Sequence, residues 1–160
     1  MKIYFWLALP AILFCQSLLA IEMPLQTLDG KTENLADYRG KWTVVNYWAT
    51  WCPPCREEMP ELQAYHDNHA DKDGVVIGIN TEEIEPAAIR EFLDDYFVTY
   101  PNYAEKPAYK TKLGTIPGLP TTYVISPAGT IEARQVGGVT REMIENFIEK
   151  WEAKQRSETR

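Results

Sequence analysis

Residues 42–60 read WTVVNYWATWCPPCREEMP and carry the pattern from which the fold is predicted. Their first part, WTVVNYW (residues 42–48), is β-branched and aromatic, which is typical of a buried strand. A Pro-Pro pair follows at 53–54, and prolines are tolerated in the first turn of a helix because its N–H groups have no intrahelical partner. The stretch therefore predicts a buried strand that leads into a helix beginning at the Cys-x-x-Cys pair, Cys52 and Cys55.

The sequence on either side predicts an α/β domain. The first helix is expected to run to about His69 with a kink at Pro60. The other expected elements are a hairpin around Asp29-Gly30, a strand at 75–80, a helix at 86–97, a helical turn at 109–113, strands at 121–125 and 130–136, and a final helix capped by Thr140 before a frayed tail at 153–160. Strands separated by helices pair in parallel, and strands joined by a turn pair antiparallel. The predicted fold is a central mixed β-sheet flanked by helices, with an N-terminal β-hairpin.

Residues 1–20 differ in composition from the rest of the chain. Lys2 is their only charge, and residues 3–20 are almost wholly apolar. This layout is typical of a secretory signal peptide that ends at the small residue Ala20. An uncleaved membrane anchor is the alternative, since a span needs ~20 apolar residues. In either case residues 21–160 are expected to form an exported domain, in the periplasm or at the outer face of the cytoplasmic membrane.

Length and charge narrow the classes of function. A chain of 160 residues suits one domain with a real core. Its formal net charge of -7 argues against binding to nucleic acid, which requires a Lys/Arg-rich face. No long apolar stripe is left over, so a monomer is expected.

The cysteine content indicates redox chemistry. Cys15 lies in the N-terminal segment, so the exported body keeps only Cys52 and Cys55. A structural disulfide stabilises by closing a long loop, and this pair closes a very short one. A closed zinc site needs four ligands, a number that the two thiols reach only with both histidines. His66 and His69 are instead expected to be exposed residues of the first helix. We therefore predict a redox-active dithiol/disulfide pair with no metal and no other cofactor.

The position of the pair suggests a role for each cysteine. A helix N-terminus stabilises a thiolate through its free N–H groups and its dipole. Cys52 is therefore expected to attack a substrate disulfide, and Cys55, one turn further along, to resolve the mixed disulfide. The intervening Pro53 and Pro54 restrict the loop and are expected to tune the redox potential.

Residues 46–60 resemble the active-site segment of the thioredoxin superfamily. More narrowly, they resemble its exported TlpA/ResA/DsbE-like branch, whose pattern is W-A-T-W-C-x-P-C-x-x-E-x-P. The matching residues are Trp48, Trp51, Cys52, Pro54, Cys55, Glu58 and Pro60. The resemblance extends over about residues 22–150.

A second matching segment lies far along the chain, where residues 118–122 read GLPTT. The resemblance implies that Pro120 is cis and lies against the cysteine loop, and that the backbone of Leu119 pairs with the substrate. The residues expected to bind the substrate are Trp51, Pro53, Pro54, Leu119 and Pro120.

The resemblance also implies a buried acid near the cysteines. Cytoplasmic thioredoxins carry an Asp where this chain has Asn46, which cannot exchange a proton near neutral pH. Glu83 is the candidate for the acid that the family places after its second buried strand, with Glu82 next. Burial would raise its pKa and suit it to take the proton of Cys55. A solvated acid at a helix start is the alternative for Glu83, and Glu58 is interpreted as favouring the helix start.

The resemblance implies an enzyme, a disulfide reductase that acts on protein disulfides, with cytochrome c maturation as one possible setting. Such a reductase would receive electrons from a membrane thiol donor of the DsbD/CcdA type. The alternatives are a protein disulfide oxidant, a peroxidase of the peroxiredoxin type and a non-catalytic metal-binding module. The acidic surface and the Glu83 candidate favour the reductase, because neither stabilises a thiolate strongly.

Overall fold

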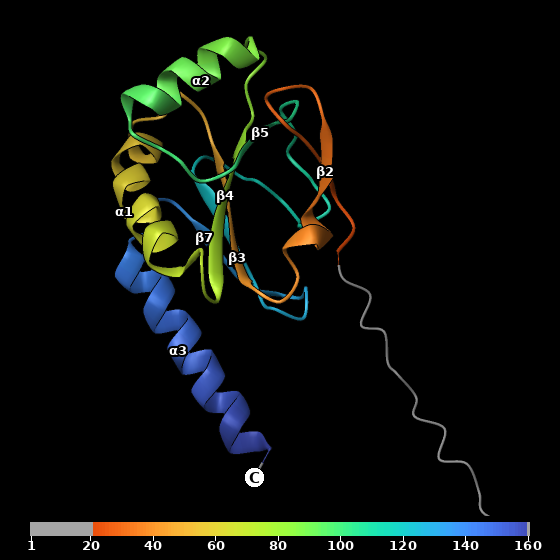
Figure 1. The fold of residues 1–160 in the computed structure, drawn as a ribbon, viewed down its shortest axis with the longest axis vertical. Helices are drawn as coiled ribbons and strands as arrows, with labels where there is room; N and C mark the ends of the chain where they lie inside the picture. Colours follow the sequence, from red (N-terminus) through yellow and green to blue (C-terminus); the bar gives the residue numbers. More distant parts are fainter. Residues whose placement is uncertain (1–20, 160) are drawn as a thin grey trace, which may run out of the picture.

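The computed structural model describes residues 21–159, so the predicted signal or anchor segment 1–20 lies outside the described residues. A five-stranded sheet in the order β5-β4-β3-β6-β7 forms the centre, and β1 and β2 form a separate antiparallel pair (Figure 1). The elements are β1 (Pro24–Gln26), β2 (Thr32–Asn34), the 3-10 helix η1 (Leu35–Tyr38), β3 (Trp42–Trp48), α1 (Pro53–His69), β4 (Gly74–Asn80), α2 (Pro86–Asp95), β5 (Asn102–Ala104), β6 (Thr121–Ile125), β7 (Ile131–Val136) and α3 (Arg141–Glu158).

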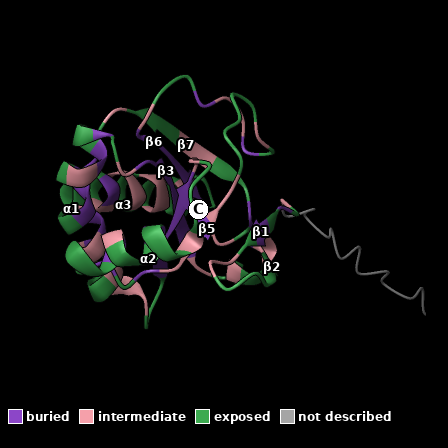
Figure 2. Cartoon of the chain, turned by 90° about the horizontal axis from the view of Figure 1, so that it is seen from above, coloured by how far each residue is buried: buried purple, intermediate pink, exposed green. Residues whose placement is uncertain are grey.

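The central sheet is mixed, as predicted. Strand β3 pairs in parallel with β4 and antiparallel with β6, so that Val45 lies opposite Ile77 on one side and Tyr123 on the other. The closing β6–β7 pair is antiparallel, and the short edge strand β5 is parallel to β4. All seven residues of β3 are buried, because the strand has neighbours on both sides and packed layers on both faces (Figure 2).

Alternation along β3 divides the core into two clusters. Val44 and Trp48 point to the helices, and Val45 and Tyr47 point to the opposite face, since successive side chains of a strand alternate. The helix-side cluster contains both cysteines together with Met59, Leu62, Tyr65, Ile89, Leu93, Tyr100 and Ile144. The opposite cluster contains Met23, Leu25 and Leu35 from the N-terminal hairpin and η1, packed on β3, β4 and β6. The active-site helix thus starts inside one of two continuous hydrophobic clusters.

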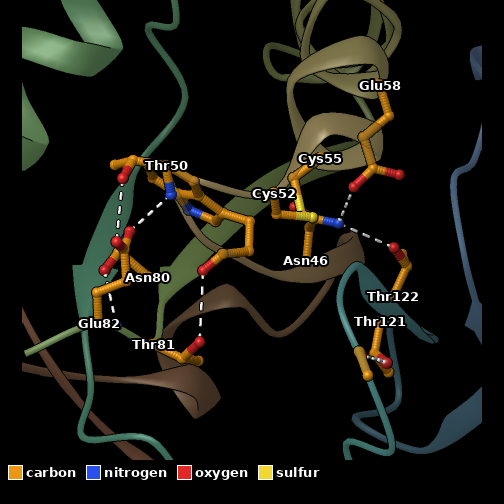
Figure 3. The surroundings of a disulfide bond; sticks show 12 residues. Asn46, Thr50, Cys52, Cys55, Glu58, Asn80, Thr81, Glu82, Thr121 and Thr122 are labelled. Carbon is orange, nitrogen blue, oxygen red and sulfur yellow. Dashed lines mark hydrogen bonds between the residues drawn. A yellow bond between two sulfur atoms is a disulfide. The ribbon is translucent and has the colours of Figure 1, made fainter.

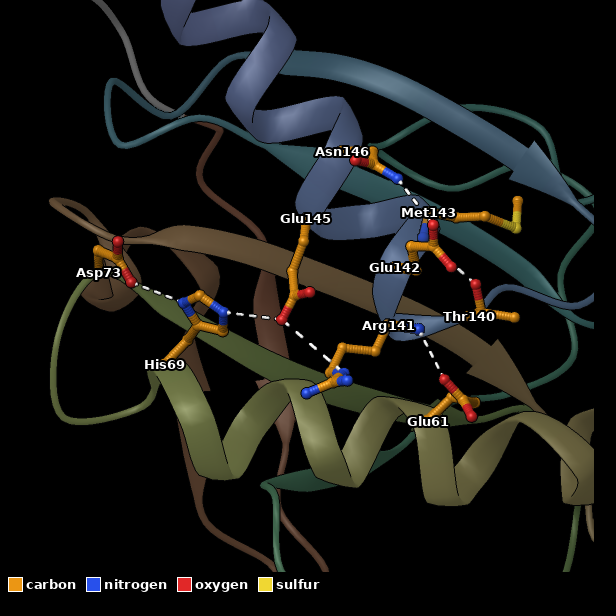
Figure 4. A network of polar contacts seen from close by, with 9 residues as sticks. All are labelled: Glu61, His69, Asp73, Thr140, Arg141, Glu142, Met143, Glu145 and Asn146. Atoms are coloured by element: carbon orange, nitrogen blue, oxygen red, sulfur yellow. Dashed lines mark hydrogen bonds and ion pairs between the residues drawn. The ribbon is translucent and has the colours of Figure 1, made fainter.

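Helices α1 and α3 are joined by polar contacts at the surface (Figure 4). The backbone N–H of Arg141 donates to Glu61 at 3.0 Å, and His69 lies 3.3 Å from Glu145 and 2.9 Å from Asp73. His69 is therefore half-buried between carboxylates, rather than exposed as the sequence suggested, and His66 is half-buried beside it on α1.

Three local predictions were wrong, and one strand was missed. Residues 109–113 form no helical turn, and the strand β5 was missed because it has only three residues, Asn102–Ala104. Helix α2 ends at Asp95, and Phe97 is 83% exposed with φ +54°, because the Val98 N–H folds back to the carbonyl of Leu93 and terminates the helix. The expected frayed tail is helical to Glu158.

The end of α3 is supported by (i, i+4) ion pairs between Lys154 and Glu158 and between Arg156 and Glu152.

In the described part of the chain, none of the helices combines the length and the apolar character needed to cross a bilayer.

Candidate active site

A disulfide joins Cys52 and Cys55 at the start of α1, with 5.3 Å between the two Cα atoms (Figure 3). Strand β3 ends at Trp48, and a short loop brings the chain to Cys52, which is the N-cap of α1. The N–H of Cys52 donates to the carbonyl of Ala49 at 3.2 Å, which tightens this loop. Cys52 keeps a 2% exposed fraction and Cys55 none, so any access to the disulfide is through Cys52.

Glu58 is the buried acid of this site. It lies one helical turn beyond Cys55 on the same face of α1, and only 3% of its surface is exposed. One carboxylate oxygen accepts from Nδ2 of Asn46 at 2.7 Å, and the other accepts from the N–H of Val139 at 2.9 Å. Loss of solvation raises the pKa of Glu58 to about 7, although the bonds from Val139 and Asn46 act to lower it. A group with this pKa can both take and release a proton near neutral pH.

Asn46 anchors that carboxylate to the sheet. Its Nδ2 also donates to Oγ1 of Thr122 at 3.0 Å, and the two residues face each other across the β3–β6 pair. Asn46 lies at the position where cytoplasmic thioredoxins carry an Asp. Here it is the hydrogen-bond donor that holds the acid, and the carboxylate itself comes from α1.

The expectation that Glu83 would be buried is wrong. Glu83 lies in the segment between β4 and α2, and its side chain is exposed. The sequence did contain a signal for Glu58 instead. Cys55, Met59 and Leu62 follow the helical period that marks the inner face of α1, and Glu58 lies within that stripe.

Glu82 connects the active-site loop to the end of β4 (Figure 3). Its carboxylate accepts from the N–H of Thr50 at 2.6 Å, from Oγ1 of Thr50 at 3.0 Å and from Nδ2 of Asn80 at 3.0 Å. Thr50 lies two residues before Cys52, so Glu82 is a positioning residue for the loop that carries the first cysteine.

We expect Glu82→Ala to lower the free energy of unfolding by about 1–3 kcal/mol, because the Thr50 and Asn80 donors lose their acceptor. Urea unfolding of the oxidised protein measures this change. Glu83→Ala is the matched control, and since that side chain is exposed its effect should stay within about 0.5 kcal/mol. Equal losses in the two variants would contradict the role given to Glu82.

The expected substrate side of the site contains a cis peptide bond and a hollow. The Leu119–Pro120 bond is cis, which confirms that prediction. Trp51 and Leu119 line a hollow of about 650 Å³. The other lining residues are Thr81, Glu82, Glu83, Ile84, Pro107, Ala108, Tyr109, Ile116 and Gly118. Pro53 and Pro54 are exposed on the first turn of α1, whereas Pro120 is buried. The structure therefore brings Trp51 and Leu119 together in one hollow. The volume of this hollow suits a side chain or a short peptide segment.

Within residues 21–159, no group of three or more His, Cys, Asp or Glu side chains is arranged to hold a metal ion. The carboxylates of Glu58 and Glu82, which lie near the disulfide, instead accept hydrogen bonds from other residues of the protein.

A disulfide that opens the helix following a central strand defines a thioredoxin-like thiol–disulfide oxidoreductase, and the comparisons with known proteins agree. The chain belongs to the AhpC/TSA family, whose sequence profile matches residues 18–134. This membership confirms the thioredoxin-like resemblance noted in the sequence.

The similar proteins identify the branch of the family. The chain is 34% identical over 131 residues to the thioredoxin-like protein YneN of Bacillus subtilis, covering 81% of this chain and 76% of the relative. It is 32% identical over 130 residues to the thiol-disulfide oxidoreductase ResA of Halalkalibacterium halodurans, covering 81% and 73%. The names of these relatives favour thiol–disulfide exchange over a peroxidase.

Solved structures agree with the fold. A DsbF homologue from Corynebacterium diphtheriae superposes with a TM-score of 0.71 at 32% identity, covering 82% of this chain and 85% of that one. A thiol:disulfide interchange protein from Chlorobium tepidum gives 0.71 at 27% identity, covering 82% and 93%.

Proposed function

We propose that the protein is an exported disulfide reductase that acts on protein disulfides, with Cys52 as nucleophile and Cys55 as resolving thiol. The observation that supports this most directly is the Cys52–Cys55 disulfide with a buried carboxylate, Glu58, one helical turn beneath it. Once the disulfide is reduced to the dithiol, the same helix start supplies the electron pair, and Glu58 supplies a proton acceptor.

The reaction starts from the reduced protein. The Cys52 thiolate is stabilised by the N-terminus of α1. Pro53 and Pro54 have no N–H, so the first backbone donor of the helix is the N–H of Cys55. Attack of the Cys52 sulfur on a substrate disulfide forms a mixed disulfide and releases one substrate thiolate.

Resolution requires Cys55 to lose its proton, and Glu58 is the buried group that accepts it. The Cys55 thiolate then attacks the Cys52 sulfur, the Cys52–Cys55 disulfide forms and the second substrate thiol leaves. The substrate has gained two electrons and two protons, and the protein has lost them. Glu58 takes over the role that the sequence had suggested for Glu83.

The direction of electron flow is argued from charge. A buried carboxylate beside the cysteines disfavours their thiolate forms, because like charges repel in a site of low dielectric. The reduced form is then weakly stabilised, which lowers the potential and makes the protein a reductant. An oxidant of the same fold would need the opposite, a strongly stabilised thiolate.

The cellular setting follows from the resemblance. Residues 1–20 would act as a signal peptide or anchor, and the domain would work in the periplasm or at the outer face of the cytoplasmic membrane. A membrane thiol donor of the DsbD/CcdA type would reduce it again, and cytochrome c maturation is one process that it would serve. The similarity to proteins named ResA supports this branch of the family.

The test is the reduction potential of the Cys52–Cys55 couple, measured by equilibrating residues 21–160 with defined thiol/disulfide buffers. We expect a value near that of thioredoxin, ~-270 mV, or lower. A value near ~-120 mV would identify a protein disulfide oxidant. The absence of a two-electron couple would contradict the redox function itself.

A further inference from the structure

The hollow lined by Trp51, the residue that precedes Cys52, also contains a second exposed aromatic ring and a carboxylate that binds no other residue of 21–159. Trp51 is 66% exposed and Tyr109 is 69% exposed, although aromatic rings are usually buried. Glu82 is occupied by Thr50 and Asn80, whereas Glu83 makes no hydrogen bond or ion pair with any residue of 21–159. Glu83 is therefore free to meet a group from outside the chain.

The charged side chains that line this hollow are all negative. Glu82 and Glu83 are the charged residues among those that line the hollow, and no Lys or Arg of the described chain lines it. The same two carboxylates border a neighbouring hollow, where Glu105 and Lys106 are the other charged residues. Glu83 thus borders two hollows, and the one that it shares with Trp51 has no Lys or Arg among its described lining residues.

A surface with these parts complements a basic side chain. An ammonium or guanidinium group is attracted to the faces of Trp and Tyr rings and to a carboxylate. The aliphatic stem of Lys or Arg packs on apolar surface while its charged end stays in water. Ile84, which is 39% exposed, and the half-buried Leu119 supply such a surface beside the rings.

We propose that Glu83 is a specificity-determining residue that selects substrate disulfides flanked by Lys or Arg. The basic side chain lies in the hollow between Trp51 and Tyr109 with its charge toward Glu83, while the neighbouring substrate cysteine meets Cys52. The inference rests on the proposed function, because it concerns which disulfides the same dithiol reduces.

The test uses three oxidised decapeptides, each with one internal disulfide. They are identical except that the residues flanking both cysteines are Lys, Gln or Glu. The pre-reduced protein, freed of reductant, is mixed with excess peptide, and the second-order rate of oxidation is followed by tryptophan fluorescence. We expect the Lys peptide to react about fivefold faster than the Gln peptide and the Glu peptide about fivefold slower, as one exposed charge contact allows. The spread should shrink at high salt.

The variants separate local selection from general attraction. Glu83→Lys should reverse the order of the three peptides. Glu91→Lys changes the net charge equally on an exposed position of α2 outside the hollow, and it should keep the wild-type order. Equal rates for all three peptides, or the same change of order in both variants, would overturn the inference while leaving the reductase intact. Failure of the wild-type protein to reduce any of the three peptides would count against the proposed function.

Discussion

Cys55→Ser is expected to remain covalently bound to its substrate, and Cys52→Ser is expected to form no adduct at all. Cys52 keeps the residual exposure of the pair and lies at the N-cap of α1, so it is the sulfur that a substrate disulfide can reach. Without the Cys55 thiol the mixed disulfide has no internal route to resolution. Turnover of a peptide disulfide should fall to the uncatalysed background in both variants.

Intact-mass measurement after mixing each reduced variant with oxidised peptide tests this assignment. The two single variants are controls for each other, because each keeps one thiol in the same loop. An adduct on Cys52→Ser and none on Cys55→Ser would reverse the order of attack. Equal amounts of adduct on the two variants would mean that a substrate disulfide reaches both sulfurs, which would contradict the assignment of Cys52 as the attacking residue.

Glu58→Gln is expected to slow formation of the Cys52–Cys55 disulfide by about a hundredfold at pH 8, the range in which a lost general base acts. Gln keeps the size of the side chain but cannot accept the proton of Cys55. The wild-type rate should rise with pH as Glu58 ionises, near its pKa of about 7, and this rise should be absent in the variant. Stopped-flow fluorescence with excess oxidised peptide measures both rates.

Glu57→Gln is the matched control, since Glu57 is the preceding residue of α1 and is exposed. It should keep the wild-type rate and pH profile. A wild-type profile in Glu58→Gln would remove Glu58 from the mechanism.

The same titration should appear in stability. Folding raises the pKa of Glu58 from its ordinary value of 4.5 to about 7, so the folded protein binds more protons than the unfolded chain between these values. The contribution of Glu58 to the free energy of unfolding is complete below about pH 4.5. It is lost as the pH rises through about 7, and the total loss is about 3 kcal/mol. Urea unfolding across this range should show the loss in the wild type, and the loss should be reduced in Glu58→Gln.

Much of the fold followed from the sequence, because its strongest signals were local. The run of apolar residues in β3 and the Pro-Pro pair at the start of α1 each specify one element, and the structure places both at the predicted residues. The missed strand β5 is an edge strand of three residues, paired with β4 only. Such a strand is stabilised by its pairing with β4, and its three residues are too few to show the alternation of apolar and polar side chains that predicts a strand.

The part of the site that depends on local sequence motifs was also predicted. The cysteines and the cis bond at Pro120 lie in contiguous motifs, and the structure forms the disulfide and the cis bond there. The buried acid depends on three segments that are distant in the sequence, since Asn46 and the backbone of Val139 both bind Glu58. A carboxylate on a helix is ordinarily solvated, and only the tertiary structure, with Asn46 of β3 and Val139 before α3 bound to Glu58, shows that this one is buried.

The bond from Val139 gives the active site a connection to the far end of the chain. Val139 is 81 residues beyond Glu58 and comes just before Thr140, the N-cap of α3. While Glu58 is ionised, its negative charge strengthens the bond that holds this junction, and when it takes the proton of Cys55 that strengthening is withdrawn. In the proposed cycle this bond weakens when Glu58 is protonated and strengthens again when Glu58 ionises, so the junction that leads into α3 is expected to respond to each proton transfer.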